Sequence, residues 1–207
     1  MLRKSSFNSV DVILNLFKNL SEDKQRTCIN ELLSECNSNT LIPIPVSISV
    51  RSEHRKGTTM FYGVYLQMNN GEEVKVDFES RSSQLMYVYT LLHPNGFQRR
   101  VLEKNDYKEL ANLFCVLFGT APDTFLRSLK HKKSQKELDH FFSHAISRSR
   151  AAIKKVMEKA IRYSVSHQGA WNDMFIDNPH HNNGRTVIPF AVNQEKIFID
   201  AKLREAV

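Results

Sequence analysis

The chain has 207 residues, a net charge of +7 and 41% hydrophobic residues, which is ordinary for a globular protein with a buried core. Seven Gly and six Pro exclude a collagen-like or low-complexity chain. No apolar run approaches the ~18 residues that cross a bilayer, and no signal peptide is expected, so we expect a cytoplasmic protein without membrane contact.

Residues 1–40 are expected to form a helical extension of two helices, for which Ser9 and Ser21 are the candidate N-caps. Apolar residues recur at helical spacing in both, namely Val10, Ile13, Leu14, Phe17 and Leu20, then Cys28, Ile29, Leu32, Leu33 and Cys36. Two roles stay open for these helices, homodimerisation and packing against the main domain. Together with Cys115, the two cysteines are interpreted as reduced core residues, because three cysteines fit no metal spacing.

From residue 41 the apolar period changes to two, which predicts three strands in "VSISVR", "MFYGVYLQM" and "EEVKVDF". Asn69, Asn70 and Gly71 join the last two strands and predict a tight hairpin, because Asn and Gly tolerate positive φ. The pattern therefore indicates a three-stranded antiparallel sheet with one apolar face, which needs a helical layer to cover it.

Three main helices are expected next, in "SSQLMYVYTLL", "YKELANLFCVLFG" and "SHAISRSRAAIKKVMEKAIRY", the last at residues 143–163. "HPNG" should stop the first, Gly119 should cap the second, and "APDTFLRSL" can add a short helix. The segments "YSVSHQ", "RTVIPFAV" and "KIFID" are predicted as strands, with a turn-rich loop over residues 169–184. We expect Trp171 to anchor that loop to the core.

Positive charge is concentrated in one segment. Residues 127–162 hold eleven Lys and Arg but only three Asp and Glu, whereas the other residues hold eighteen basic and nineteen acidic ones. A confined basic patch indicates an anionic partner more than a general solubility trait.

The long helix should have one apolar and one basic side. Its apolar stripe is predicted to comprise Phe142, Ala145, Ile146, Ser149, Ile153, Val156, Met157 and Ala160. Opposite it lie His144, Arg148, Ala151, Lys155, Lys159 and Arg162, with Arg150 and Lys154 on a flank. A helix stabilised by its own ion pairs would mix Glu with these Lys residues. The near absence of acids, with Glu158 the single one in residues 143–163, favours an external polyanion over a merely solvated surface.

DNA is the partner that fits such a helix, because an α-helix enters the major groove and basic residues reach phosphates and bases. Arg148 and Arg150 lie nearest the helix start and are the candidates for base readout. Phosphate contacts are expected from the flanking basic side chains Lys130, Lys132, Lys133, Lys136, Lys155 and Lys159. The loop before "RTVIPFAV" can add Arg185.

With these elements in order, the stretch from about Val46 to Asp200 resembles a winged-helix DNA-binding domain of the response-regulator effector type. In that type a small antiparallel sheet precedes three helices, the third helix recognises DNA, and a C-terminal hairpin forms the wing. The matching passages are "VKVDFESRSSQLMYVYTLLHPNG", "FFSHAISRSRAAIKKVME" and "YSVSHQ … GRTVIPFAV". The resemblance implies an α+β, winged-helix-like domain over residues 41–207, with three strands, three main helices and a C-terminal β-hairpin.

No catalytic motif competes with this interpretation. His180 and His181 are adjacent in an expected exposed loop, and adjacent histidines rarely aim both rings at one metal ion. Asp77 and Glu79 alternate on a strand without a neighbouring Lys that would complete a nuclease site. We therefore expect no enzyme, no metal site and no cofactor, but a transcriptional regulator that binds double-stranded DNA. The alternative is an interaction module whose basic helix docks on an acidic protein.

Overall fold

The computed structural model describes residues 17–27, 43–53, 61–98, 102–130, 134–160, 171, 173–176 and 185–207. The chain divides into two compact units, Met1–Leu41 and Ile42–Val207. In the first unit, residues 17–18 and 22–27 are helical. The rest of the two predicted N-terminal helices lies outside the described residues, so homodimerisation through them stays a prediction.

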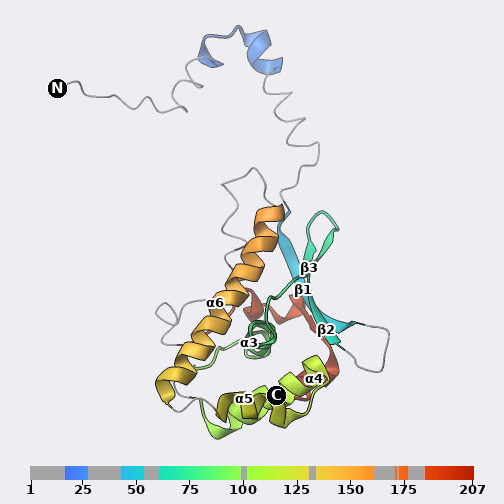
Figure 1. Ribbon diagram of the computed structural model, residues 1–207. Coiled ribbons are helices and arrows are strands. Elements are labelled where there is room, and N and C mark those ends of the chain that lie inside the picture. Colours follow the sequence, from blue (N-terminus) through green and yellow to red (C-terminus); the bar gives the residue numbers. More distant parts are fainter. Residues whose placement is uncertain are drawn as a thin grey trace, which may run out of the picture. The chain divides into compact units, whose positions relative to one another are not determined.

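The second unit is an α+β domain whose described residues form a four-stranded sheet with strand order β3-β2-β1-β4 (Figure 1). β1 is Pro45–Glu53, β2 is Phe61–Met68 and β3 is Glu73–Val76, and these three strands are antiparallel neighbours. Gly71 has a φ of 86° in the turn between β2 and β3, and its N–H donates to the Met68 carbonyl at 3.0 Å. The predicted hairpin is thus confirmed.

The fourth strand corrects the prediction of a three-stranded antiparallel sheet. β4, Ile197–Ile199, pairs with β1 in parallel, so the sheet is mixed. Ile197 lies opposite Ile48 in the register, and their side chains are 3% and 0% exposed. Because Ile197 is buried beside the apolar face of β1, burial of apolar surface favours placing β4 in the sheet over a separate C-terminal hairpin.

In the described part of the chain, the helices that follow the antiparallel strands are α3 Arg81–Leu92, α4 Lys104–Phe118, α5 Pro122–Lys130 and α6 Gln135–Ala160. Gly119 ends α4 with a φ of 57°, which confirms the predicted glycine cap. α6 begins eight residues before the predicted helix, at a turn where the Ser134 hydroxyl accepts from the Glu137 N–H at 3.2 Å. Its predicted last residues, 161–163, lie outside the described residues.

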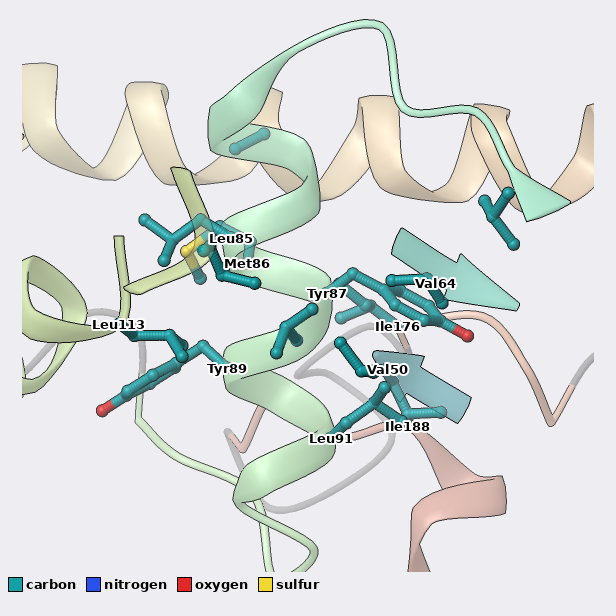
Figure 2. Close-up of a cluster of buried hydrophobic side chains, with 14 of the residues drawn as sticks. Val50, Val64, Leu85, Met86, Tyr87, Tyr89, Leu91, Leu113, Ile176 and Ile188 are labelled. Atoms are coloured by element: carbon teal, nitrogen blue, oxygen red, sulfur yellow. The ribbon is translucent and has the colours of Figure 1, made fainter. Parts of the chain in front are cut away.

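α3 is the central helix of the domain and lies between the sheet and α6 (Figure 1). In its sequence, Leu85, Met86, Tyr89 and Leu92 recur at helical spacing and predict one apolar stripe, but every residue over the range 85–91 is buried. Figure 2 shows why: Tyr89 extends from α3 toward Leu113 of α4, whereas Tyr87 extends toward β2. The helix is covered on several sides at once, so its polar Thr90 is buried too and donates to the Met86 carbonyl at 2.6 Å.

The C-terminal region contains a second correction. The segment predicted as the strand "RTVIPFAV" forms an isolated antiparallel bridge between Thr186 and Phe97, followed by a 3-10 turn at Pro189–Val192. Pro189 has no N–H to donate to a strand ladder, which accounts for the early end of pairing. The other half of the predicted hairpin, residues 163–168, lies outside the described residues.

The chain then closes through a further 3-10 turn, Gln194–Lys196, then β4 and the short helix α8, Ala201–Arg204. Trp171 is 0% exposed, and its indole N–H donates to the Pro43 carbonyl at 3.1 Å. The prediction that Trp171 anchors its loop to the core is therefore confirmed. Over the described part of the chain, no helix has the length and apolar character to cross a membrane.

Candidate functional site

α6 is fixed to the domain by one apolar side. Figure 2 shows it crossing behind α3, and at this crossing the buried Ser149 hydroxyl lies 2.6 Å from the Ser83 carbonyl oxygen. The side chains buried on this side are Phe142, Ala145, Ile146, Ser149, Ala152, Ile153 and Val156. Met157 and Ala160 of the predicted stripe pack partly buried against the same core.

The opposite side of α6 is exposed along its length. The exposed residues from the second turn onward are His140, His144, Ser147, Arg148, Arg150, Ala151, Lys154, Lys155, Glu158 and Lys159. We call this set the basic face. It contains six of the residues predicted to contact DNA, and their predicted exposure is confirmed.

The basic residues of this face form two rows. With 3.6 residues per turn, Arg148, Lys155 and Lys159 lie on one flank, and Arg150 and Lys154 lie roughly 140° around the helix axis on the other. Ser147 and Ala151, whose side chains are small, lie on the line between the rows, as does Glu158 nearer the C-terminal end of α6. A partner can therefore approach the helix backbone between two lines of positive charge.

Most of these charges are not neutralised by the protein itself. Lys154 pairs with Glu158 at 3.5 Å, in a contact where both side chains are more than 60% exposed. Among the residues that the structure describes, Arg148, Lys155 and Lys159 have no ion pair. Lys155 and Lys159 lie one turn apart, and like charges at this spacing cost a few tenths of a kcal/mol.

The other predicted contact residues are distributed around α6. Lys130 ends α5 and Lys136 lies in the first turn of α6, and both are exposed. Arg185 is exposed elsewhere, where its guanidinium donates to the Asn95 carbonyl at 2.9 Å. Lys132, Lys133 and Arg162 lie outside the described residues.

A polar cluster on the uncovered face of the sheet was not predicted from the sequence. The Tyr65 hydroxyl donates to the Glu53 carboxylate at 2.8 Å, and Lys75 pairs with the same carboxylate at 2.5 Å. Burial, followed by the hydrogen bond to Glu53, raises the pKa of Tyr65. A Cβ atom at Gly63 would lie 2.1 Å from a Glu53 oxygen, so this glycine leaves the room that the carboxylate occupies.

Arg51 extends the same cluster. The guanidinium carbon of Arg51 lies 4.1 Å from the centre of the Tyr65 ring. The guanidinium also pairs with Glu73, and the hydrogen bond to Glu73 is the main cause of the raised pKa of Arg51. Each of these ionic groups has a partner within the sheet, so the cluster stabilises cross-strand pairing. The alternation of residues within each strand predicts which side chains lie on the polar face. It does not predict which of them are neighbours, because that depends on the register between the strands.

The residues considered for catalysis or metal binding are dispersed. Asp77 and Glu79 are both exposed. Cys115 is half-buried and lines a groove of about 450 Å³ between α4 and α8, which corrects its interpretation as a core residue. Cys28, Cys36, His180 and His181 lie outside the described residues. In the described part of the chain, no group of three or more His, Cys, Asp or Glu is arranged to hold a metal ion.

Comparisons with protein-family models, with curated proteins and with solved structures gave no match. The basic face of α6 is thus the strongest candidate site, and its interpretation depends on its own geometry and charge.

Proposed function

We propose that this protein is a transcriptional regulator that binds double-stranded DNA through the basic face of α6. The observation that carries the proposal is the exposed row of Arg148, Lys155 and Lys159, which lack ion pairs among the described residues. Unpaired like charges cost stability within the folded protein, and an external row of phosphates would offset that cost. The proposed role is binding, without catalysis.

The winged-helix assignment is part of this proposal. It is supported by the chain order, in which an antiparallel meander precedes α3, α4 and the long helix α6. The parallel strand β4 and the 3-10 turn at Pro189–Val192 depart from that pattern. The proposal therefore depends on α6 and its charges, and not on a C-terminal wing.

Docking in the major groove would place the two rows against opposite DNA strands. The groove is about 12 Å wide and admits one helix, so rows on both flanks of α6 would face the phosphates of the two strands. Ser147 and Ala151 between the rows would let the helix backbone approach the base edges. Arg148 and Arg150, whose long side chains can bend toward the bases, remain the candidates for base readout.

The test is a titration of fluorescently labelled duplex DNA at several salt concentrations, followed by anisotropy. If the six lysines expected to contact phosphates each neutralise one, the log–log slope of affinity against salt is about −5.4. Replacement of Lys155 and Lys159 by Ala should reduce the magnitude of that slope by about 2. The matched control replaces the exposed Lys196 and Lys202, which lie outside α6 and remove the same charge.

Equal losses in the two double variants would contradict the assignment of binding to α6, because net charge alone would then explain the affinity. A second comparison separates roles: replacing Arg148 and Arg150 should reduce discrimination between DNA sequences, whereas replacing Lys132 and Lys133 should weaken binding to all sequences alike. A partner that is retained from lysate after nuclease treatment would favour the acidic-protein alternative.

A further inference from the structure

His140 and His144 form a pair on the exposed side of α6. They lie four residues apart within one regular helix, and both side chains are exposed. Their ring centroids are 6.4 Å apart and their ring planes differ by 14°. The two imidazoles therefore lie side by side near the N-terminal end of the basic face.

The rings are nearly parallel, and their separation is close to that of two rings that share one ion. Zinc–nitrogen bonds of 2.0–2.1 Å hold the centres of two coordinated imidazoles roughly 5 to 6 Å apart. Histidines at i and i+4 of a helix are a known spacing for chelation, because both rings leave the same face. Small rotations about the side-chain torsions bring one nitrogen of each ring to a common point.

Neither ring is committed to another partner. Among the described residues, His140 and His144 have no hydrogen bond and no ion pair, apart from their contact with each other. The nearest basic neighbour one turn on, Arg148, repels a bound cation. Uncharged imidazole nitrogens form partly covalent bonds to transition metal ions. A site made of imidazoles therefore tolerates a nearby positive charge better than a site made of carboxylates, which holds its cation by charge.

We propose that His140 and His144 chelate one divalent late first-row transition metal ion of the Zn²⁺, Ni²⁺ and Cu²⁺ class. Imidazole nitrogen suits these ions, whereas Mg²⁺ and Ca²⁺ require oxygen ligands. Two protein ligands leave further coordination positions for water. The ion thus binds on a surface that remains open to a second molecule.

This site has a consequence that rests on the proposed DNA-binding function. His144 belongs to the basic face, so a bound ion adds two positive charges where a phosphate would lie. Its exchangeable water can be replaced by a phosphate oxygen or a base nitrogen of DNA. Metal loading then strengthens DNA binding at a given salt concentration.

The site itself is tested without DNA, by calorimetric titration of the full chain with NiCl₂ at pH 7.5. Changes in the outer shell of metal sites cost roughly 10- to 100-fold in affinity, so loss of either ligand in His140→Ala or His144→Ala should lower the affinity for Ni²⁺ at least as much. The matched control combines His144→Ser with Ser147→His, which keeps both histidines on the exposed side but places them two turns apart, at a distance that one ion cannot bridge.

The control should lose the same binding step as the single variants, and the variant with His180→Ala and His181→Ala should keep it. The proposal would be overturned if either single variant or the spacing control kept the nickel-binding step. It would also be overturned if the variant at His180 and His181 lost that step. A Cu²⁺ electron paramagnetic resonance spectrum with two coordinated nitrogens, reduced to one in His140→Ala, gives the independent signature of chelation.

DNA titrations with and without NiCl₂ separate this inference from the proposed function. Stronger DNA binding with Ni²⁺ in the wild type, and no such change in His140→Ala, supports both. Intact Ni²⁺ binding in a protein that binds no DNA overturns the proposed function and leaves the metal site standing. Intact DNA binding without the nickel-binding step overturns the metal site alone.

Discussion

α3 and α6 pack against each other, yet they present opposite kinds of surface. Over residues 85–91, α3 is buried on every side, including its tyrosines and Thr90. α6 buries one side and exposes Arg, Lys and His residues along the other. The two helices meet at Ser149 and Ser83, where small side chains allow a close approach of the backbones.

The difference shows that the surroundings of a helix decide what its sequence pattern can reveal. A helix covered on one side needs only one apolar stripe, and that stripe is visible in the sequence of α6. A helix covered on all sides has no polar face to contrast with, so the pattern of α3 predicts less burial than it has. Charge on α6 is thus available for a partner, whereas the buried Ser83 and Thr90 of α3 serve the fold.

The largest effect should come from the centre of α3. Leu91 is 0% exposed and lies beside Val50 and Ile188 (Figure 2). Leu91→Ala should lower the free energy of unfolding by about 2 to 5 kcal/mol, because it removes buried contacts and leaves a cavity. Urea unfolding measures this free energy. The matched control is Leu92→Ala, because Leu92 is a half-buried neighbour in the same helix. A smaller loss at Leu91 than at Leu92 would show that α3 is not covered as described.

The next effect concerns alkaline pH. Burial raises the pKa of Tyr87 above its ordinary value of 10.0, and its hydroxyl donates to the Met174 carbonyl at 3.1 Å. Above pH 10 the unfolded chain therefore loses the tyrosine proton while the folded chain keeps it, so stability falls as pH rises. The loss approaches about 1.4 kcal/mol per pH unit for this group.

Tyr87→Phe removes that dependence. Near pH 8 it should be less stable than the wild type by about 1 kcal/mol, because a hydrogen bond is lost. Between pH 10 and pH 11 the difference should shrink and then reverse. Both proteins share every other titrating group, so parallel stability curves over this range would mean that the Tyr87 phenol ionises freely in the folded state.

Sequence reasoning was strongest where local chemistry decides the structure. The Asn-Gly hairpin, the Gly119 cap and the buried stripe of α6 follow from residue types at short spacing, and all three are present. The α+β class follows from the change of period from two to 3.6 along the chain. The candidate site was predictable for the same reason, since the exposed residues of one helix are set by its own periodicity.

It was weakest where distant segments meet. β4 lies beside β1 because Ile197 is buried next to Ile48, and three residues of local pattern cannot specify a partner about 150 residues away. The polar cluster of Glu53, Tyr65 and Lys75 depends on the register of three strands. The prediction of a strand over residues 185–192 failed since its apolar pattern was given more weight than Pro189.

The contact between the two helices should give a smaller effect. The Ser149 hydroxyl lies within hydrogen-bonding distance of the carbonyl oxygens of Ser83 and Ala145, and its single proton serves one of them at a time. Ser149→Ala should cost about 1 kcal/mol, because the hydroxyl is buried and bonded. Ser147→Ala, on the exposed side of α6, is the control and should change little. Equal effects at the two serines would place the crossing elsewhere on α6.

The smallest effect on stability should come from the basic face itself. Replacing Lys155 and Lys159 by Gln keeps long side chains on the helix and removes a like-charge pair, so the free energy of unfolding should change by less than about 0.5 kcal/mol and should not fall. Thermal or urea unfolding measures this beside the salt-dependent DNA titration. A large loss of stability would mean that these lysines have partners within the protein, and the face would then not be free for DNA. Unchanged stability with weakened DNA binding would assign the partner to the exposed side of α6, since the fold depends on α3 and on the buried side of α6.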